Sequence, residues 1–392
     1  MQSIKASRRG ELVHMDPTIS LLKRLVATDS VNPTLVPGAA GEAAVARVLA
    51  EELQRFGLRV DIQEAAPGRP NVIGTLQGRR AGRSLMLCGH IDTVGVAGMT
   101  KPFDPVERNG RLYGRGSQDM KSGVAAMVGA AEIIAEAGGL DAGSLIIACV
   151  VDEEHSSIGA DALVTKFRAD AAVVTEPTEL SVAVAHKGFE WVEVETEGRA
   201  AHGSRPRDGR DAILRMGRVL SRLEALDREL QAGSTHALLG AASLHASLIE
   251  GGRELSSYPD RCSLQIERRT IPGEAAGCGG REVERILAAL RAEDPEFRAA
   301  SRVMFYRAPY EIAASHELPS KLREAAGSAG VSAPVIGMSF WTDAAVLGGA
   351  GIPSVLFGPS GAGLHGLEEW VEVESVLKCR DALANLARVW CQ

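Results

Sequence analysis

Several features that identify common classes of protein are missing from this 392-residue sequence. It has no long basic run, and its 43 Lys and Arg residues against 50 Asp and Glu residues give a net charge of −7. No nucleic-acid partner is therefore expected. The longest apolar stretch, residues 145–151, is far shorter than the roughly 20 residues that span a bilayer, so no membrane partner is expected either.

Paired cysteines and an export signal are also missing. The six cysteines, at positions 88, 149, 262, 278, 379 and 391, form no CxxC pair. Cys88 and Cys149 lie in apolar runs, where a free cysteine packs as a small hydrophobic residue. Residues 1–17 are charged and lack the apolar segment of a signal peptide. We therefore expect reduced thiols and a cytoplasmic location.

What remains is the composition of a globular protein, with 45% apolar and 24% charged residues. Apolar residues recur with the spacing of a helix at 45–56 and 124–131. These segments alternate with short apolar runs at 71–76, 84–88, 145–151 and 171–174. These runs are apolar at successive positions, as in strands that are buried on both faces. The pattern predicts an α/β fold with a mostly parallel sheet that helices cover on both sides.

The pattern changes after about residue 187. Val192, Val194 and Thr196 alternate with glutamates, which is typical of a sheet with one wet face. The following segments predict the order β-α-β-β-α-β, which is the ferredoxin-like arrangement. From about residue 310 the α/β character returns. We therefore expect one α/β domain, formed by residues 1–186 and 308–392, with an α+β domain inserted at 187–307.

Five segments place a histidine or a carboxylate near the carboxyl ends of expected strands, the edge at which α/β sheets bind ligands. Their chemically interesting residues are His90 with Asp92, Asp119, Glu153 with Glu154, Glu176, and His365. Histidine and carboxylate ligands suit Zn²⁺, and two histidines with several carboxylates can hold two divalent ions that share a bridging aspartate. The conjunction predicts a metal site.

Each segment taken alone has a simpler explanation. His90 can be a hydrogen-bonded core histidine, and residues 152–154 can be a solvated acidic loop. Asp119 can be a helix N-cap. The Gly-rich loop at 114–123 can cradle a phosphate at a helix N-terminus, although the Walker spacing is missing.

With these motifs the chain resembles the co-catalytic zinc hydrolases that include acetylornithine deacetylase, succinyl-diaminopimelate desuccinylase, aminoacylase-1 and glutamate carboxypeptidase. The motifs are GHIDTV at 89–94, GRGSQDMKSG at 114–123, DEE at 152–154, TEP at 175–177 and the late His365. The resemblance implies a zinc-exopeptidase-like catalytic domain with an inserted lid and dimerisation domain. It implies one metal held by His90, Asp119 and Glu176, and a second held by Asp119, Glu154 and His365.

The same resemblance implies roles for residues that do not bind metal. Glu153 corresponds to the general base, and Asp92 to the acid that orients His90. In the inserted segment, His202 matches a histidine that reaches across a dimer to the substrate's carbonyl oxygen. Arg269 falls where the family places an arginine that contacts a substrate carboxylate, with Arg268 as its neighbour.

One residue departs from the family's pattern, and one has no assigned role. Ser256 stands where many relatives carry an asparagine that contacts substrate, which leaves that contact in doubt. His155 follows the acidic triplet, although no spacing requires it to bind metal.

The activity that follows is hydrolysis of the amide bond of an N-acyl amino acid or small peptide. Two Zn²⁺ ions per chain are expected, with Co²⁺ or Mn²⁺ as substitutes, and a homodimer is expected through the inserted domain. Within the family that the chain resembles, a glutamate rather than an aspartate at the position of Glu176 favours acylases, desuccinylases and carboxypeptidases. Two alternatives stay open, namely a dipeptidase or aminopeptidase of the same family and a catalytically silent protein that binds amino acids or peptides.

Overall fold

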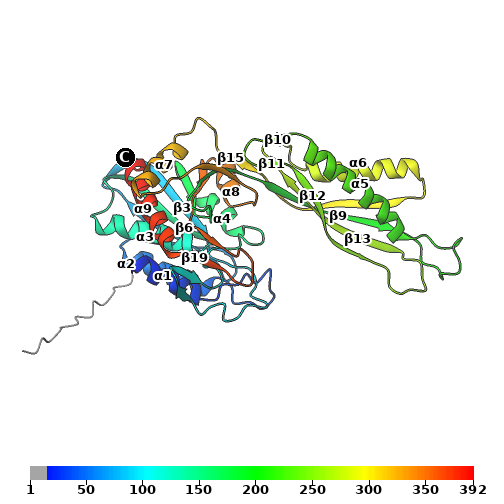
Figure 1. Ribbon diagram of the computed structural model, residues 1–392, viewed down its shortest axis with the longest axis horizontal. Coiled ribbons are helices and arrows are strands. Elements are labelled where there is room, and N and C mark those ends of the chain that lie inside the picture. Colours follow the sequence, from blue (N-terminus) through cyan, green and yellow to red (C-terminus); the bar gives the residue numbers. More distant parts are fainter. Residues whose placement is uncertain (1–15) are drawn as a thin grey trace, which may run out of the picture.

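A nine-stranded sheet forms the centre of the larger of two lobes in the computed structural model, which describes residues 16–392 (Figure 1). Its strands follow the order β1-β2-β6-β3-β7-β17-β8-β15, and β16 pairs with β8. They are β1 (Arg59–Ala66), β2 (Arg69–Gln77), β3 (Arg80–His90), β6 (Ala142–Val150), β7 (Ala171–Val174), β8 (Val182–His186), β15 (Tyr310–Glu311), β16 (Val335–Met338) and β17 (Ser354–Leu356).

The sheet is mixed, so the expectation of a mostly parallel sheet is wrong. The central strands β6, β3, β7 and β17 run parallel to one another, whereas β1, β2 and β15 pair antiparallel with their neighbours. Only Pro67 and Gly68 separate β1 from β2, and so short a connection can join antiparallel strands alone. Apolar periodicity could not reveal this, because it reports which faces of a strand are buried and not the strand's direction.

Helices cover both faces of this sheet, as the apolar runs indicate. Successive residues of β3 belong to two different cores, with Leu85 and Leu87 on one face and Met86 and Cys88 on the other. The first core is closed by α1 (Pro17–Ala27), α2 (Ala43–Arg55), α3 (Lys121–Glu136), α7 (Leu318–Ser328) and α9 (Val373–Trp390). The second is closed by α4 (Ile158–Lys166) and α8 (Ala344–Gly349).

The smaller lobe contains a four-stranded antiparallel sheet in the order β12-β13-β9-β14 (Figure 1). Its elements are β9 (Gly188–Glu197), α5 (Ala212–Ala232), β12 (Ser243–Gly251), β13 (Arg261–Thr270), α6 (Cys278–Glu293) and β14 (Arg298–Arg307), with a small hairpin of β10 (Thr235–His236) and β11 (Gly240–Ala241) between α5 and β12. The two long helices close a separate core over one face of the sheet. The order of the main elements is β-α-β-β-α-β.

Two short connections join the lobes. The chain passes from β8 to β9 at Lys187 and returns from β14 to β15 through residues 308–309. A second four-stranded sheet, beside the large one, consists of β4 (Val106–Arg108), β5 (Arg111–Tyr113), β18 (Gly361–Ala362) and β19 (Trp370–Glu372).

Three expectations concern a membrane partner, an export signal and the cysteines. Within residues 16–392, none of the helices combines the length and the hydropathy needed to cross a bilayer. The absence of an export signal concerns residues 1–17, of which 1–15 lie outside the described part of the chain. All six cysteines are free.

Candidate metal centre

The sheet brings the candidate ligands to one edge. His90 is the last residue of β3, Glu153 and Glu154 lie in the turn after β6, and Glu176 lies two residues after β7. Because β6, β3 and β7 are parallel neighbours, their carboxyl ends meet at the same place. Asp119 arrives from the loop before α3.

His365 comes from the loop between β18 and β19, so it reaches the edge from the second sheet of the larger lobe. It is about half exposed, whereas His90 is fully buried.

The ligand atoms form two groups that share one residue. His90, Asp119 and Glu176 offer atoms that all lie within 4.8 Å of one another, and so do Asp119, Glu154 and His365. The carboxylate of Asp119 joins the groups, because its Oδ1 lies 3.0 Å from His90 Nε2 and its Oδ2 lies 3.4 Å from His365 Nε2. These are the two sets that the sequence resemblance implies.

Glu153 stands beside these groups and belongs to neither. Its Oε2 lies 3.9 Å from His90 Nε2, and its side chain is largely buried. It lines a cavity of ≈ 270 Å³ together with four candidate ligands and four more apolar residues. The ligands are Asp119, Glu154, Glu176 and His365, and the more apolar residues are Pro177, Phe340, Trp341 and Leu364. This lining contains no lysine or arginine among the described residues.

The protonation of the site reflects this shortage of positive charge. Burial, and after it the charge of Glu176, raises the pKa of Glu153 well above its ordinary value. Burial also raises the pKa of Glu154 and Glu176. Hydrogen bonds that the His365 ring donates to the carboxylates of Asp119 and Glu154 raise the pKa of His365 to about 10. Divalent cations would balance this cluster of carboxylates, and the charge and the donor set fit such cations.

Asp92 contacts both His90 and the turn after β6. His90 Nδ1 lies 3.1 Å from the backbone oxygen of Asp92 and 3.5 Å from its Oδ1. The Asp92 carboxylate accepts hydrogen bonds from the backbone N–H groups of Glu153 at 3.1 Å and Glu154 at 3.3 Å. It therefore fixes both the ring on β3 and the turn after β6.

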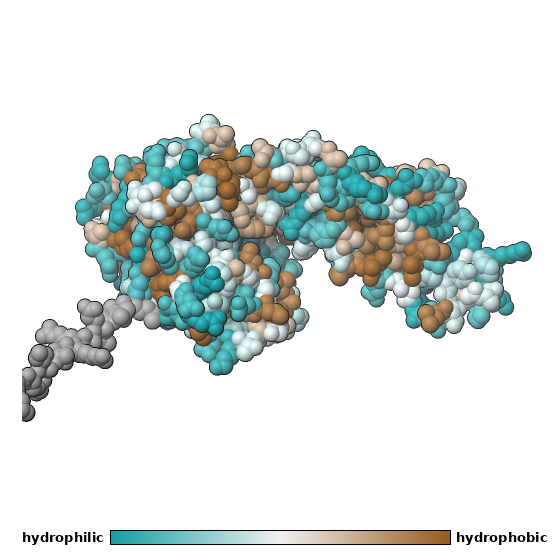
Figure 2. All heavy atoms as spheres, viewed as in Figure 1, coloured by the Kyte–Doolittle hydropathy of each residue, from teal (hydrophilic) through white to brown (hydrophobic). Residues whose placement is uncertain are grey.

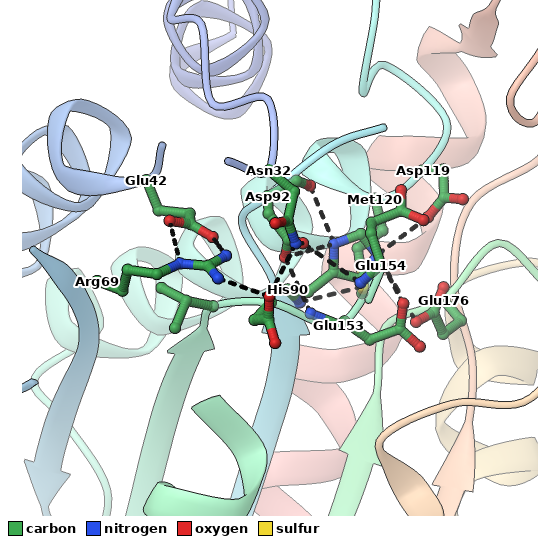
Figure 3. A network of polar contacts seen from close by, with 12 residues as sticks. Asn32, Glu42, Arg69, His90, Asp92, Asp119, Met120, Glu153, Glu154 and Glu176 are labelled. Carbon is green, nitrogen blue, oxygen red and sulfur yellow. Dashed lines mark hydrogen bonds and ion pairs between the residues drawn. The ribbon is translucent and has the colours of Figure 1, made fainter. Parts of the chain in front are cut away.

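Behind Asp92 lies a buried polar network that motif reasoning missed (Figure 3). Asn32 donates to Asp92, and Arg69 donates to Asp152 at 2.6 Å and forms an ion pair with Glu42. All of these side chains are buried. They come from segments 60 or more residues distant in sequence from some of their partners, so spacing gave no signal for them.

The Gly-rich loop is occupied by a carboxylate of the protein itself. Glu369 accepts hydrogen bonds from the backbone N–H groups of Gly116, Gln118 and Asp119, at 2.8 to 3.0 Å, and from Arg115 Nη1 at 2.6 Å. These donors are therefore not available to cradle a phosphate.

The N-cap alternative for Asp119 fails as well. The cap of α3 is Met120, which makes no side-chain cap bond, and the Asp119 side chain faces the two histidines.

The predicted residues His202 and Arg269 belong to neither ligand group of their own chain. His202 is exposed on the loop after β9, where its Nδ1 lies 2.8 Å from Ser204 Oγ and its backbone pairs with Ser257. The ten residues of β9 span about 30 Å, at roughly 3.3 Å per residue, and separate this loop from the junction of the lobes. The neighbouring Ser256 is also exposed.

Arg268 and Arg269 point to opposite faces of β13, as strand alternation requires. Arg268 is fully buried and pairs with Glu274 and Glu282. Arg269 lies on the other face, with its Nε 2.6 Å from Glu267 Oε1.

A series of aromatic contacts connects Arg269 to the wall of the cavity. Its guanidinium stacks over the ring of Phe189, at 5.5 Å, and Phe189 contacts Trp341, which lines the cavity. His155 belongs to neither ligand group, and Cys88 is packed in the core.

Comparison with known proteins places the chain in a family. Residues 86–389 match the peptidase family M20/M25/M40. The chain is 32% identical over 384 residues to an acetylornithine deacetylase from Myxococcus xanthus, covering 94% of this chain and 96% of the relative. It is 27% identical over 422 residues to N-formyl-4-amino-5-aminomethyl-2-methylpyrimidine deformylase from Bacillus subtilis (strain 168), covering 100% and 98%.

Solved structures share the fold over nearly the whole length of the chain. One is a dinuclear metal-binding peptidase of the M20 family from Bacillus subtilis, with a TM-score of 0.73, 16% identity and coverage of 95% of this chain and 97% of that chain. Fold and ligand groups define the class of metal-dependent hydrolases. The chain belongs to the peptidase family M20/M25/M40 and is an enzyme that hydrolyses amide bonds.

Proposed function

We propose that this enzyme is a two-zinc amidohydrolase that cleaves the amide bond of N-acyl amino acids or small peptides with a free carboxylate. The observation that carries the proposal is the position of Asp119 between two ligand groups, with the spare carboxylate of Glu153 beside them. A related structure is described as a dinuclear metal-binding peptidase.

Zinc suits the donor set, which consists of two imidazole nitrogens and three carboxylates. His90, Asp119 and Glu176 would hold one ion, and Asp119, Glu154 and His365 the other. Bound zinc supplies Lewis-acid chemistry, which lowers the pKa of water and polarises a carbonyl group. Co²⁺ and Mn²⁺ would serve as substitutes.

Glu153 is the proposed general base. Its backbone N–H is fixed by Asp92, and burial raises the pKa of its carboxyl well above the ordinary value, as suits a group that exchanges protons. It takes a proton from the attacking water and delivers it to the departing amine. Asp92 orients His90 and holds the turn that carries Glu153. Because both are held in place, neither His90 nor Glu153 has to reorganise during the reaction.

The proposed substrate carries a carboxylate because of Arg269. Glu267 and the ring of Phe189 orient its guanidinium, and these described partners engage only Nε and the guanidinium face. The terminal nitrogens can then bind a carboxylate in bidentate fashion. Both relatives compared above bear names of enzymes that remove a small acyl group from an amine, which favours a small acyl group here.

We also propose a homodimer formed by the smaller lobe, in which residues 187–307 act as a lid and dimerisation domain. The strand β12 is at the edge of its sheet, and α5 packs against it. Together they expose Ile213, Leu214, Leu248 and Ile249. Figure 2 shows hydrophobic side chains gathered on this lobe.

An open strand edge beside an apolar surface favours pairing with a second copy. A dimer would bring the exposed His202 of one chain to the metal centre of its partner, where it would stabilise the developing oxyanion.

The experiment is a substrate panel read by amine release. The purified chain would be loaded with Zn²⁺, Co²⁺ or Mn²⁺ and offered N-formyl and N-acetyl amino acids, N-succinyl amino acids and dipeptides. We expect hydrolysis of N-acyl substrates. Cleavage confined to substrates with a free amine would favour the dipeptidase or aminopeptidase alternative, and metal binding without cleavage would favour a silent binding protein.

A matched pair of variants tests the base. Glu153→Ala should keep two metal ions per chain and lower kcat by about 10²- to 10⁴-fold, the usual contribution of general acid–base catalysis. Glu51→Ala, an exposed glutamate on α2, should change neither quantity. An active Glu153→Ala variant would show that another group moves the proton.

A further inference from the structure

Asn32 is buried in the segment between α1 and α2, and its backbone is tied to the chain that follows β3. Its N–H donates to the Thr93 carbonyl at 2.9 Å, and Thr93 N–H donates to the Ser30 carbonyl at 3.0 Å. The side-chain oxygen of Asn32 accepts a hydrogen bond from Thr34 N–H at 2.9 Å. With the oxygen engaged there, the amide NH₂ must face the other way.

Both amide hydrogens of Asn32 go to carboxylates, and Figure 3 shows Asp92, one of the two, beside Asn32. Nδ2 donates to Asp92 Oδ2 at 2.8 Å and to Asp152 Oδ1 at 3.0 Å. An amide NH₂ has two hydrogens, so its donor capacity is fully used. The three side chains are fully or almost fully buried, and without the amide the two carboxylates would lose a shared partner.

These two carboxylates hold the turn after β6 from both sides. Asp92 binds the backbone N–H groups of Glu153 and Glu154, and Asp152 accepts a hydrogen bond from Ser156 Oγ at 2.6 Å. The turn needs such support because Asp152 has φ +70°, a left-handed conformation that is unfavourable for a residue other than glycine.

Arg69 supports the same turn from the far side. It donates to Asp152 Oδ1 at 2.6 Å and pairs with Glu42. Among the described contacts, Arg69 reaches Asp152 but not Asp92. Asn32 is therefore the side chain that links the two carboxylates.

We propose that Asn32 is a positioning residue that locks Asp92 and Asp152 together and thereby fixes Glu153 and Glu154 at the metal centre. The proposal rests on the proposed roles of these two glutamates. Asn32 itself touches neither a ligand atom nor the cavity, so it acts through Asp92. Partners of this kind, one contact removed from a metal site, typically affect metal affinity or activity by about 10- to 100-fold.

Two variants of Asn32 remove its donors in different ways. Asn32→Ala deletes both hydrogens without adding charge, while Asn32→Asp keeps the shape and adds a third carboxylate beside Asp92 and Asp152. Because buried like charges repel, Asn32→Asp should be the more harmful change.

Asn71→Asp is the matched control. Asn71 is equally buried, donates to Gln63 Oε1 at 3.1 Å and to the Gly159 carbonyl at 2.8 Å, and accepts from Val151 N–H at 3.1 Å. It thus holds the two ends of the same turn without a hydrogen bond to Asp92 or Asp152.

The measurements are the melting temperature, the metal Kd from chelator competition, and kcat and KM on the best substrate of the panel. We expect Asn32→Ala to lower kcat or weaken the metal Kd by about 10-fold and Asn32→Asp by up to about 100-fold, with KM changed less than kcat. Asn71→Asp should lose stability while kcat and metal Kd stay within about threefold of wild type.

Two results would overturn the proposal. One is a folded Asn32→Ala protein with wild-type kcat and metal Kd. The other is an Asn71→Asp protein that loses kcat and metal affinity as much as the Asn32 variants at equal loss of stability. If the wild type cleaves no amide, the proposed function fails, and the metal Kd still tests the positioning role.

Discussion

Gly123 sits where the N-terminal turn of α3 meets the end of β7, and replacing it should disturb the metal centre at a distance. A Cβ on Gly123 would lie 2.0 Å from the Thr175 carbonyl oxygen and 2.8 Å from its Oγ1. Real Cβ atoms essentially never approach another heavy atom more closely than 3.0 Å, so the helix and the strand end must move apart by at least about 1 Å.

The movement would act directly on one ligand group. Asp119 lies just before α3, and Glu176 follows Thr175, so the displacement separates two ligands of the same proposed ion. A misplacement of about 1 Å at an active site can cost about 100-fold in rate. We therefore expect Gly123→Ala to lower kcat by about 100-fold and to weaken metal binding, with about 1–3 kcal/mol of lost stability from overpacking.

Gly217→Ala is the control, because it changes a glycine inside α5 whose Cβ would meet nothing within 4 Å. This variant should be more stable by about 0.5–1 kcal/mol and fully active. Metal content after dialysis, chelator competition and kcat would be compared in both variants. A Gly123→Ala enzyme with wild-type metal affinity and kcat would refute the reasoning, because the close packing of α3 against Thr175 would then not govern the ligand geometry.

Two further predictions concern the junction and the dimer. Burial lowers the pKa of His186 to about 4, below its usual value near 6.5, so the unfolded chain binds a proton first and stability is lost as the pH falls from about 6.5 to 4. Urea unfolding at pH 7 and pH 4.5 should show that His186→Phe loses about 2–3 kcal/mol less over this interval than wild type does, and equal losses would rule out His186 as the source. Mixing inactive Glu153→Ala chains with inactive His202→Ala chains should restore activity, because a hybrid dimer contains one site with both residues; no recovery in verified hybrids would contradict the role of His202 across the interface.

The sequence predicted the elements that build the site better than the sheet that carries them. The apolar runs at 71–76, 84–88 and 171–174 became β2, β3 and β7, because buried strands of this kind are apolar at every position. The strand β1 was missed, since it is an edge strand with a mixed, partly exposed pattern.

The candidate ligands could be predicted because each lies in a short motif near the end of a strand or in a loop. Asn32, Arg69 and Glu369 could not, because each acts through hydrogen bonds to residues far away in the chain. Asn32 precedes a proline and Glu369 follows another glutamate, and neither setting differs from that of an ordinary loop residue. Local patterns thus reveal the groups that do chemistry more readily than the groups that hold them in place.

The two connections at Lys187 and 308–309 have a consequence for how such an enzyme can diversify. Phe189 and Arg307 pair directly, at the start of β9 and the end of β14, so the chain leaves and re-enters the larger lobe at neighbouring points. Every residue of the two ligand groups that share Asp119 lies outside the segment between them. That segment can therefore be lengthened or reshaped without rerouting the backbone that carries the ligands, so substrate recognition can change as long as His202 keeps its proposed position.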